Sequence, residues 1–190
     1  MGLYTVISDT SCSILEMLRK TVSPEPISKP ETIGLCQPNE RGNNILGIYL
    51  YDVKEAEGMR SQERIKLDDK HYKEPPQSFY LNYMIFVHST SEVATRMIDE
   101  QRILGRVLQQ MNNYRRVPDE FLVGSLKENN EVLQIQLLSL TADEKSKIWS
   151  LFNQPYKTSV FYQVGPVYMD TELIKTTTRV TDAEFRIQQK

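Results

Sequence analysis

The stretch SFYLNYMIFV, residues 78–87, has the composition of a β-strand, because aromatic and branched side chains dominate it. Successive side chains of a strand point to opposite faces. Leu81 and Ile85 would lie on one face of this strand, and Met84 and Phe86 on the other. Both faces are apolar, so we expect the strand to be covered on both sides.

The residues that follow this strand predict a long helix over 91–112, with Ser91 as its cap. Apolar side chains recur there at three- and four-residue steps, which is the spacing of one helix face. Gly105 costs a helix about 1 kcal/mol relative to Ala, and we interpret it as room for a close crossing. The predicted buried stripe comprises Val93, Met97, Ile98, Gln101, Leu104, Val107, Leu108 and Met111.

The rest of the chain alternates between helix and strand patterns. Two further helices are predicted, over 4–22 and 141–152, and the second opens with a capping box from Thr141 to Glu144. Further strands are predicted over 32–36, 45–53, 131–138 and 158–169. Gly165 and Pro166 predict a bend or bulge in the last strand. This order indicates an α+β domain over 1–170, with a mixed, mostly antiparallel sheet packed against helices.

Two segments lack a clear pattern. Residues 54–76 are rich in charge and poor in apolar side chains. Long loops of this kind are usually functional or mobile, so we predict that this segment is mobile or contacts a neighbouring subunit. Residues 171–190 are polar, and we predict that they form a C-terminal arm or an edge strand.

Composition excludes several classes of function. The net charge is −2 over 190 residues, which argues against nucleic-acid binding. No apolar stretch approaches the ~18 residues that cross a bilayer, and the N-terminus lacks the pattern of a signal peptide. We expect the protein to be made in the cytoplasm and to leave it only as part of something larger. Cys12 and Cys36 have no nearby Cys or His partner, and we interpret them as reduced thiols.

The sequence contains no known catalytic motif, and we predict no catalytic, cofactor-binding or metal site. One enzymatic alternative remains, with Asp68, Asp69 and His71 as a site in the 54–76 loop. A second carboxylate pair, Asp99 and Glu100, would diverge by about 100° on a helix. Arg102 and Arg106 are within reach as ion-pair partners on the same helix.

Trp149 is the only tryptophan of the chain. On the apolar stripe of a short helix it is typical of a core residue. It could also serve as a platform for a stacked ligand or as an anchor at a subunit interface, where Trp, Tyr and Arg are favoured. The chain contains ten tyrosines, which favours the hypothesis that Trp149 lies at a subunit interface.

Several stretches together resemble the tail-cap family of extracellular contractile injection systems, which are particles of the antifeeding-prophage and virulence-cassette type. The stretches appear in the family's order and span nearly the whole chain. They are IGLCQP (33–38), LYDV (50–53), RILGR (102–106), WSLFNQPY (149–156) and VGPV (164–167).

The resemblance implies a phage tail-terminator-like fold and a structural protein without reaction or cofactor. It implies a ring of six copies on the last layer of inner tube and contractile sheath, assembled in the bacterial cytoplasm and released with the particle. The ring would end tube polymerisation and hold the sheath. We predict interface roles for Asp99, Arg102, Arg106, Trp149 and Tyr156. A sheath-end adaptor or a baseplate connector of the same particle is the alternative.

Overall fold

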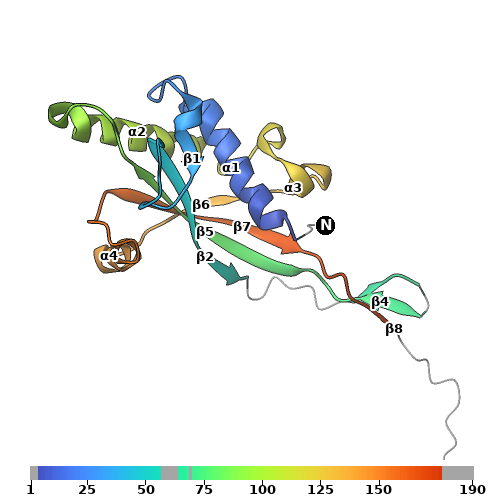
Figure 1. The fold of residues 1–190 in the computed structure, drawn as a ribbon. Helices are drawn as coiled ribbons and strands as arrows, with labels where there is room; N and C mark the ends of the chain where they lie inside the picture. Colours follow the sequence, from blue (N-terminus) through green and yellow to red (C-terminus); the bar gives the residue numbers. More distant parts are fainter. Residues whose placement is uncertain (1–3, 57–63, 69, 177–190) are drawn as a thin grey trace, which may run out of the picture.

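The main sheet has five strands in the order β1-β2-β5-β7-β6 (Figure 1). The structure is a computed structural model that describes residues 4–56, 64–68 and 70–176. The strands are β1 (Ile33–Leu35), β2 (Leu46–Glu55), β5 (Gln77–Val87), β6 (Ile135–Leu138) and β7 (Ser159–Met169). β1 runs parallel to β2, and the other neighbours pair antiparallel. The predicted mixed, mostly antiparallel sheet is therefore confirmed.

Helices cover the two faces of this sheet unequally. α1 (Val6–Val22), α2 (Val93–Asn113) and the short α3 (Gly124–Glu128) lie on one side, whereas α4 (Ala142–Ser150) lies on the other (Figure 1). The larger hydrophobic cluster joins the sheet to the first three helices, and the smaller one joins it to α4. The α+β class that the sequence predicts is therefore confirmed.

β5 is buried on both faces, as its sequence predicts. Leu81 and Ile85 pack in the larger cluster, whereas Met84 and Phe86 pack in the smaller one. Full burial of such a side chain contributes roughly 1.5–3 kcal/mol. Tyr83 is buried with them, and its hydroxyl forms a 2.8 Å hydrogen bond with the Ser11 hydroxyl. β5 therefore contributes to both clusters and connects them.

The capping box of α4 is confirmed. The backbone N–H of Glu144 donates to Thr141 Oγ1 over 3.3 Å, and the backbone N–H of Thr141 donates to Glu144 Oε2 over 2.8 Å. These bonds satisfy donors that a helix start leaves free. The helix ends at Ser150, two residues before the predicted end.

The predicted irregularity in β7 is also confirmed. The pairing of β5 with β7 shifts register between Phe79 and Leu81, opposite Gly165. Gly165 has φ +136°, and a Cβ there would lie 2.8 Å from the carbonyl oxygen of Phe79. Only glycine fits this close approach of the two strands.

Two predictions for α2 are wrong. Val93, Met97, Ile98, Gln101 and Leu108 were assigned to the buried stripe, but their side chains are exposed. A Cβ added at Gly105 would meet no atom within 4 Å, so this glycine makes no close crossing in the described part of the subunit. The sequence also gave no sign of α3 or of the 3-10 helices Pro30–Thr32 and Asp119–Phe121.

A second, three-stranded sheet lies at the far end of the molecule from α4 (Figure 1). It consists of β3 (Ile65–Lys66), β4 (His71–Lys73) and β8 (Ile174–Thr176), in that order. Two of these strands fall within 54–76, where the sequence predicts none. Residues 57–63, 69 and 177–190 lie outside the described residues. The predictions of a mobile or interface loop and of a C-terminal arm or edge strand therefore stay predictions.

Candidate assembly surfaces

The N-terminal half of α2 carries apolar side chains that the described part of the subunit leaves uncovered. This half of the helix extends past α1 and the end of the sheet (Figure 1). Val93 is 80% exposed and Met97 is 72% exposed. Val93 precedes the buried Leu104 by 11 residues, which is about three helical turns, and Met97 precedes it by seven, which is about two. Both therefore lie near the same line of the helix as Leu104. Ile98 and Arg102 are also exposed, on other sides of the same helix, and we call these four residues together the overhang surface.

The charged residues predicted for this region have different roles. Asp99 accepts hydrogen bonds from the hydroxyls of Ser89 and Ser91, the latter over 2.9 Å. Arg106 donates from Nε to the carbonyl oxygen of Thr21 over 3.1 Å. Arg102 is exposed and contacts no hydrogen-bond or ion-pair partner in the described ranges. Asp99 and Arg106 are thus fixed within the subunit, whereas Arg102 is available to a partner.

An open hollow of about 530 Å³ brings these three side chains together with the linker after α1. Glu25 and Pro26 form the wall of the hollow that faces α2. The ion pairs predicted between Asp99 and the two arginines are not formed in the part of the chain that the structure describes. The three residues share one surface, but they are not paired with one another.

The elbow that follows α4 has a buried and an exposed aromatic residue. Trp149 is 2% exposed, and its Nε1–H donates to Ser159 Oγ over 3.0 Å. Tyr156 is 51% exposed and packs edge to face on Trp149, with 6.4 Å between ring centroids. The Trp149 ring belongs to the core of the subunit. A partner can reach this elbow at Tyr156 and at the exposed Leu151.

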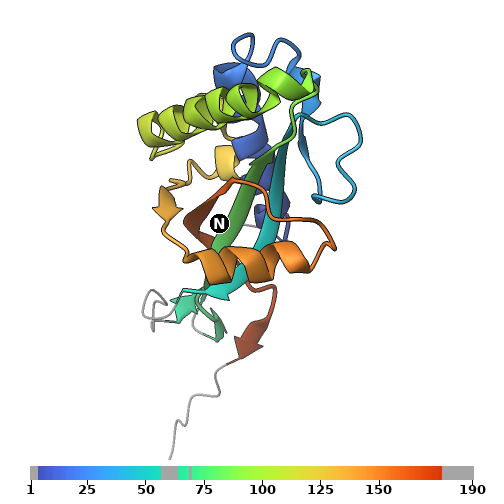
Figure 2. The same cartoon turned by 90° about the vertical axis from the view of Figure 1, so that its left-hand side faces the viewer.

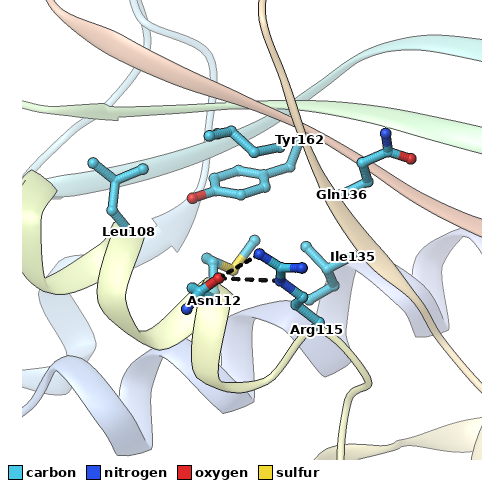
Figure 3. Close-up of a pocket in the computed structure, with 8 residues that line it drawn as sticks. Leu108, Asn112, Arg115, Ile135, Gln136 and Tyr162 are labelled. Carbon is cyan, nitrogen blue, oxygen red and sulfur yellow. Dashed lines mark hydrogen bonds between the residues drawn. The ribbon is translucent and has the colours of Figure 1, made fainter.

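A further hollow of about 240 Å³ lies between the C-terminal half of α2 and the edge strand β6 (Figure 3). Its walls include Leu108, Ile135 and Tyr162. Arg115 lies at its rim and donates to Asn112 Oδ1 over 3.0 and 2.8 Å. Burial raises the pKa of Tyr162 to about 12, so its hydroxyl stays neutral and cannot serve as a base at physiological pH.

The loop site of the enzymatic alternative is an exposed turn. Asp68 Oδ1 accepts the backbone N–H groups of Lys70 and His71 over 2.7 and 2.8 Å, and His71 Nδ1 lies 2.8 Å from Asp68 Oδ2. The bond from Lys70 is the main reason that the pKa of Asp68 is lowered. Asp69 lies outside the described residues. In the described chain this arrangement closes the turn between β3 and β4.

Neither a metal cluster nor a membrane-spanning helix occurs in the described ranges. No three His, Cys, Asp or Glu side chains there are grouped closely enough to hold a metal ion. None of the described helices combines the length with the apolar character needed to cross a membrane.

Sequence reasoning missed the exposure of the overhang, although a signal for it was present. Arg96 and Glu100 precede the buried Ile103 and Val107 by seven residues, which is about two helical turns. The line of α2 that faces the core in its C-terminal half is therefore charged in its N-terminal half. Charges on that line indicate that this half of the helix does not enter the core of its own subunit.

Comparison with known proteins places this fold. The profile of the Pvc16 N-terminal domain family matches residues 10–182. The fold is similar to a solved PVC sheath/tube terminator of an extracellular contractile injection system in its extended state. The TM-score is 0.65 at 18% identity, covering 100% of this chain and 65% of that chain.

The fold is also similar to the anti-feeding prophage cap, described as a tube-terminating cap. The TM-score is 0.57 at 15% identity, covering 98% of this chain and 62% of that chain. This chain therefore spans less than two thirds of the length of either protein. No curated protein sequence matches it. The profile match covers most of the chain and the two folds agree with it, so the chain belongs to the Pvc16 N-terminal domain family.

Proposed function

We propose that the protein is a structural terminator of a contractile injection system, which forms a ring on the end of inner tube and sheath. The ring ends tube polymerisation and anchors the sheath. The observation that carries this proposal is the family match over residues 10–182, together with the fold shared with a sheath/tube terminator and a tube-terminating cap.

The exposed surfaces support a ring. Head-to-tail contacts, in which one face of a subunit meets a different face of the next, close into a ring when the rotation permits. The subunit has exposed apolar side chains on two separate elements, the overhang surface of α2 and the elbow at Leu151 and Tyr156. A partner that covers such side chains gains roughly 25 cal/mol per Å² of apolar surface.

The proposal includes the finer points that the resemblance implies. The ring has six copies, and its partners are the inner tube protein and the contractile sheath protein. Assembly takes place in the bacterial cytoplasm, and the protein leaves the cell within the particle. No nucleic acid and no membrane insertion are involved.

The proposed role is structural rather than enzymatic. The Asp68–His71 pair, on which the enzymatic alternative depends, closes an exposed turn. Replacing both residues with Ala should leave assembly intact. Loss of a measurable activity in that variant would instead favour the enzyme.

Two measurements test the proposed function. Light scattering after size exclusion, at several protein concentrations, should show a six-copy species, and negative-stain images should show closed rings. Deleting the gene should give tubes or sheaths of uncontrolled length, which the gene supplied in trans restores. Open filaments of the purified protein would favour a sheath-end adaptor. Length-regulated particles in the deletion strain would contradict the terminator role.

A further inference from the structure

A hollow of about 270 Å³ lies at one end of the main sheet, where three separate parts of the chain meet. The β1–β2 loop contributes Arg41, the end of β5 contributes Phe86 and His88, and α4 with the loop after it contributes Trp149 and Lys157. Figure 2 shows the β1–β2 loop in blue and the segment after α4 in orange on the same side of the molecule. We call this hollow the Arg41–Lys157 pocket.

The contact between Lys157 and His88 fixes the protonation of the imidazole. Lys157 Nζ lies 2.7 Å from His88 Nδ1. An ammonium group only donates hydrogen bonds, so Nδ1 accepts and the ring carries its proton on Nε2. Burial, and then the charge of Lys157, lowers the pKa of His88, which agrees with a neutral ring. His88 is therefore a polar, uncharged group of this pocket.

The positive charges of Lys157 and Arg41 differ in whether a carboxylate of the same subunit pairs with them. Lys157 Nζ lies 3.5 Å from Glu100 Oε1, which also accepts the backbone N–H of Ser89 over 3.2 Å. Arg41 reaches only the backbone carbonyl oxygens of its own loop, each over 3.4 Å. No carboxylate pairs with Arg41 in the described ranges. One guanidinium charge is thus left for a ligand.

The remaining walls of the pocket combine apolar side chains with the amides of Asn39 and Gln154. Phe86 and Trp149 pack edge to face with 6.0 Å between their centroids, and Pro38 and Pro155 flank them. An arginine binds a carboxylate through two parallel hydrogen bonds. A carboxylate on a short carbon chain satisfies both parts of such a pocket, whereas a free phosphate leaves the apolar walls uncovered.

We propose that the Arg41–Lys157 pocket binds an aspartate or glutamate side chain of a partner protein. The carboxylate pairs with Arg41 and Lys157, and its carbon chain packs on Phe86 and Trp149. This assignment rests on the proposed terminator function in one respect, which is that the partner protein belongs to the injection particle. It adds the chemistry of one contact, namely an acidic residue of the partner.

Trp149 provides a direct readout, because it is the only tryptophan of the chain and lines the pocket. The full chain is titrated with a blocked five-residue peptide that carries two central glutamates, and with a matched peptide that carries two glutamines. We expect a saturable change in Trp149 fluorescence with the acidic peptide only. Added salt should weaken the response, because ion pairs in a half-exposed pocket are screened.

Two variants place the response in this pocket. Arg41→Gln and Lys157→Gln should each weaken peptide binding by roughly tenfold or more, as expected when one half of a charge-assisted contact is lost. Lys147→Gln is the matched control, because it removes the same charge from an exposed site of α4 that is paired with Asp143. The control should bind like the unmodified protein. Arg41→Gln keeps the Lys157–His88 contact and removes only two 3.4 Å hydrogen bonds within its own loop, so we expect this variant to fold.

Three results would overturn the proposal. They are equal responses to the two peptides, no saturable response at millimolar acidic peptide, or tighter binding of inorganic phosphate than of the acidic peptide. Ring formation is measured separately on the same samples. If rings form but the peptide does not bind, the proposed acidic ligand is refuted and the terminator role stands. If the peptide binds but rings never form, the terminator role is refuted and the proposed ligand stands.

Discussion

The two halves of α2 carry the same apolar stripe but meet different surroundings. Met111, near the C-terminal end, is 1% exposed and packs against α1 and the sheet cluster. Met97, 14 residues earlier and close to the same line of the helix, is 72% exposed. An apolar stripe therefore shows which side chains of a helix are buried in the assembled protein or complex. It does not show whether the residues that bury them belong to the same subunit.

The largest expected effect distinguishes the two methionines. Met111→Ala should lower the free energy of unfolding by about 2–5 kcal/mol, because it leaves a cavity in the core. Met97→Ala is its matched control and should change the unfolding free energy of the isolated subunit by less than about 0.5 kcal/mol. Urea denaturation followed by circular dichroism measures both. Equal losses of unfolding free energy in the two variants would mean that Met97 and Met111 are equally buried in the isolated subunit.

The second effect concerns assembly. Met97→Asp places a charge in the overhang surface and should weaken ring formation by roughly tenfold to a hundredfold, if neighbours cover this surface. Asn113→Asp adds the same charge at an exposed site at the other end of α2, far from the overhang surface. Sedimentation at several concentrations compares the two. If Asn113→Asp weakens the ring as much as Met97→Asp does, the overhang surface is not the contact.

The third effect lies at Gly105, between the two halves. Because an added Cβ meets nothing within 4 Å, Gly105→Ala should stabilise the subunit by about 0.5–1 kcal/mol. Thermal unfolding measures this gain. A lower melting temperature would show that the backbone at Gly105 needs glycine for a reason that the subunit structure does not contain. If Gly105→Ala stabilises the subunit but weakens the ring, the backbone of a neighbouring subunit packs against Gly105.

The fourth effect separates two arginines of α2, namely Arg102 in the overhang surface and Arg106 outside it. Arg102→Gln should leave stability unchanged and alter ring association by a few-fold, with a weaker salt dependence, as expected for a charge at the rim of an interface. Arg106→Gln should instead cost about 0.5–1.5 kcal/mol of stability, because it loses the hydrogen bond to Thr21. Stopped-flow light scattering at two salt concentrations measures the association. A stability loss in Arg102→Gln would reveal a contact within the subunit.

The sequence was sufficient for much of the fold because local patterns determine it. The two-sided strand β5, the capping box at Thr141 and the irregularity at Gly165 each depend on neighbouring residues, and each was predicted. The small sheet of β3, β4 and β8 was not predicted. Its strands are two or three residues long and are joined by contacts between distant parts of the chain, which no periodicity reveals.

The candidate surfaces were harder to predict than the fold. The hydrophobicity of a residue does not state which molecule covers it, so Met97 was assigned to the core. Charge could have corrected this assignment, because Arg96 and Glu100 occupy the line that Ile103 and Val107 continue. The pocket at Arg41 and Lys157 needed the structure, because those residues are far apart in the sequence and meet only through the sheet.

In the proposed ring, neighbouring subunits cover the overhang surface. Oxidation by dilute hydrogen peroxide, resolved residue by residue with mass spectrometry, tests it on the unmodified protein. In isolated subunits Met97 should oxidise quickly and Met111 slowly, as their exposure requires. In assembled rings Met97 should become as slow as Met111. A Met97 that oxidises equally fast in rings and in isolated subunits would contradict the account.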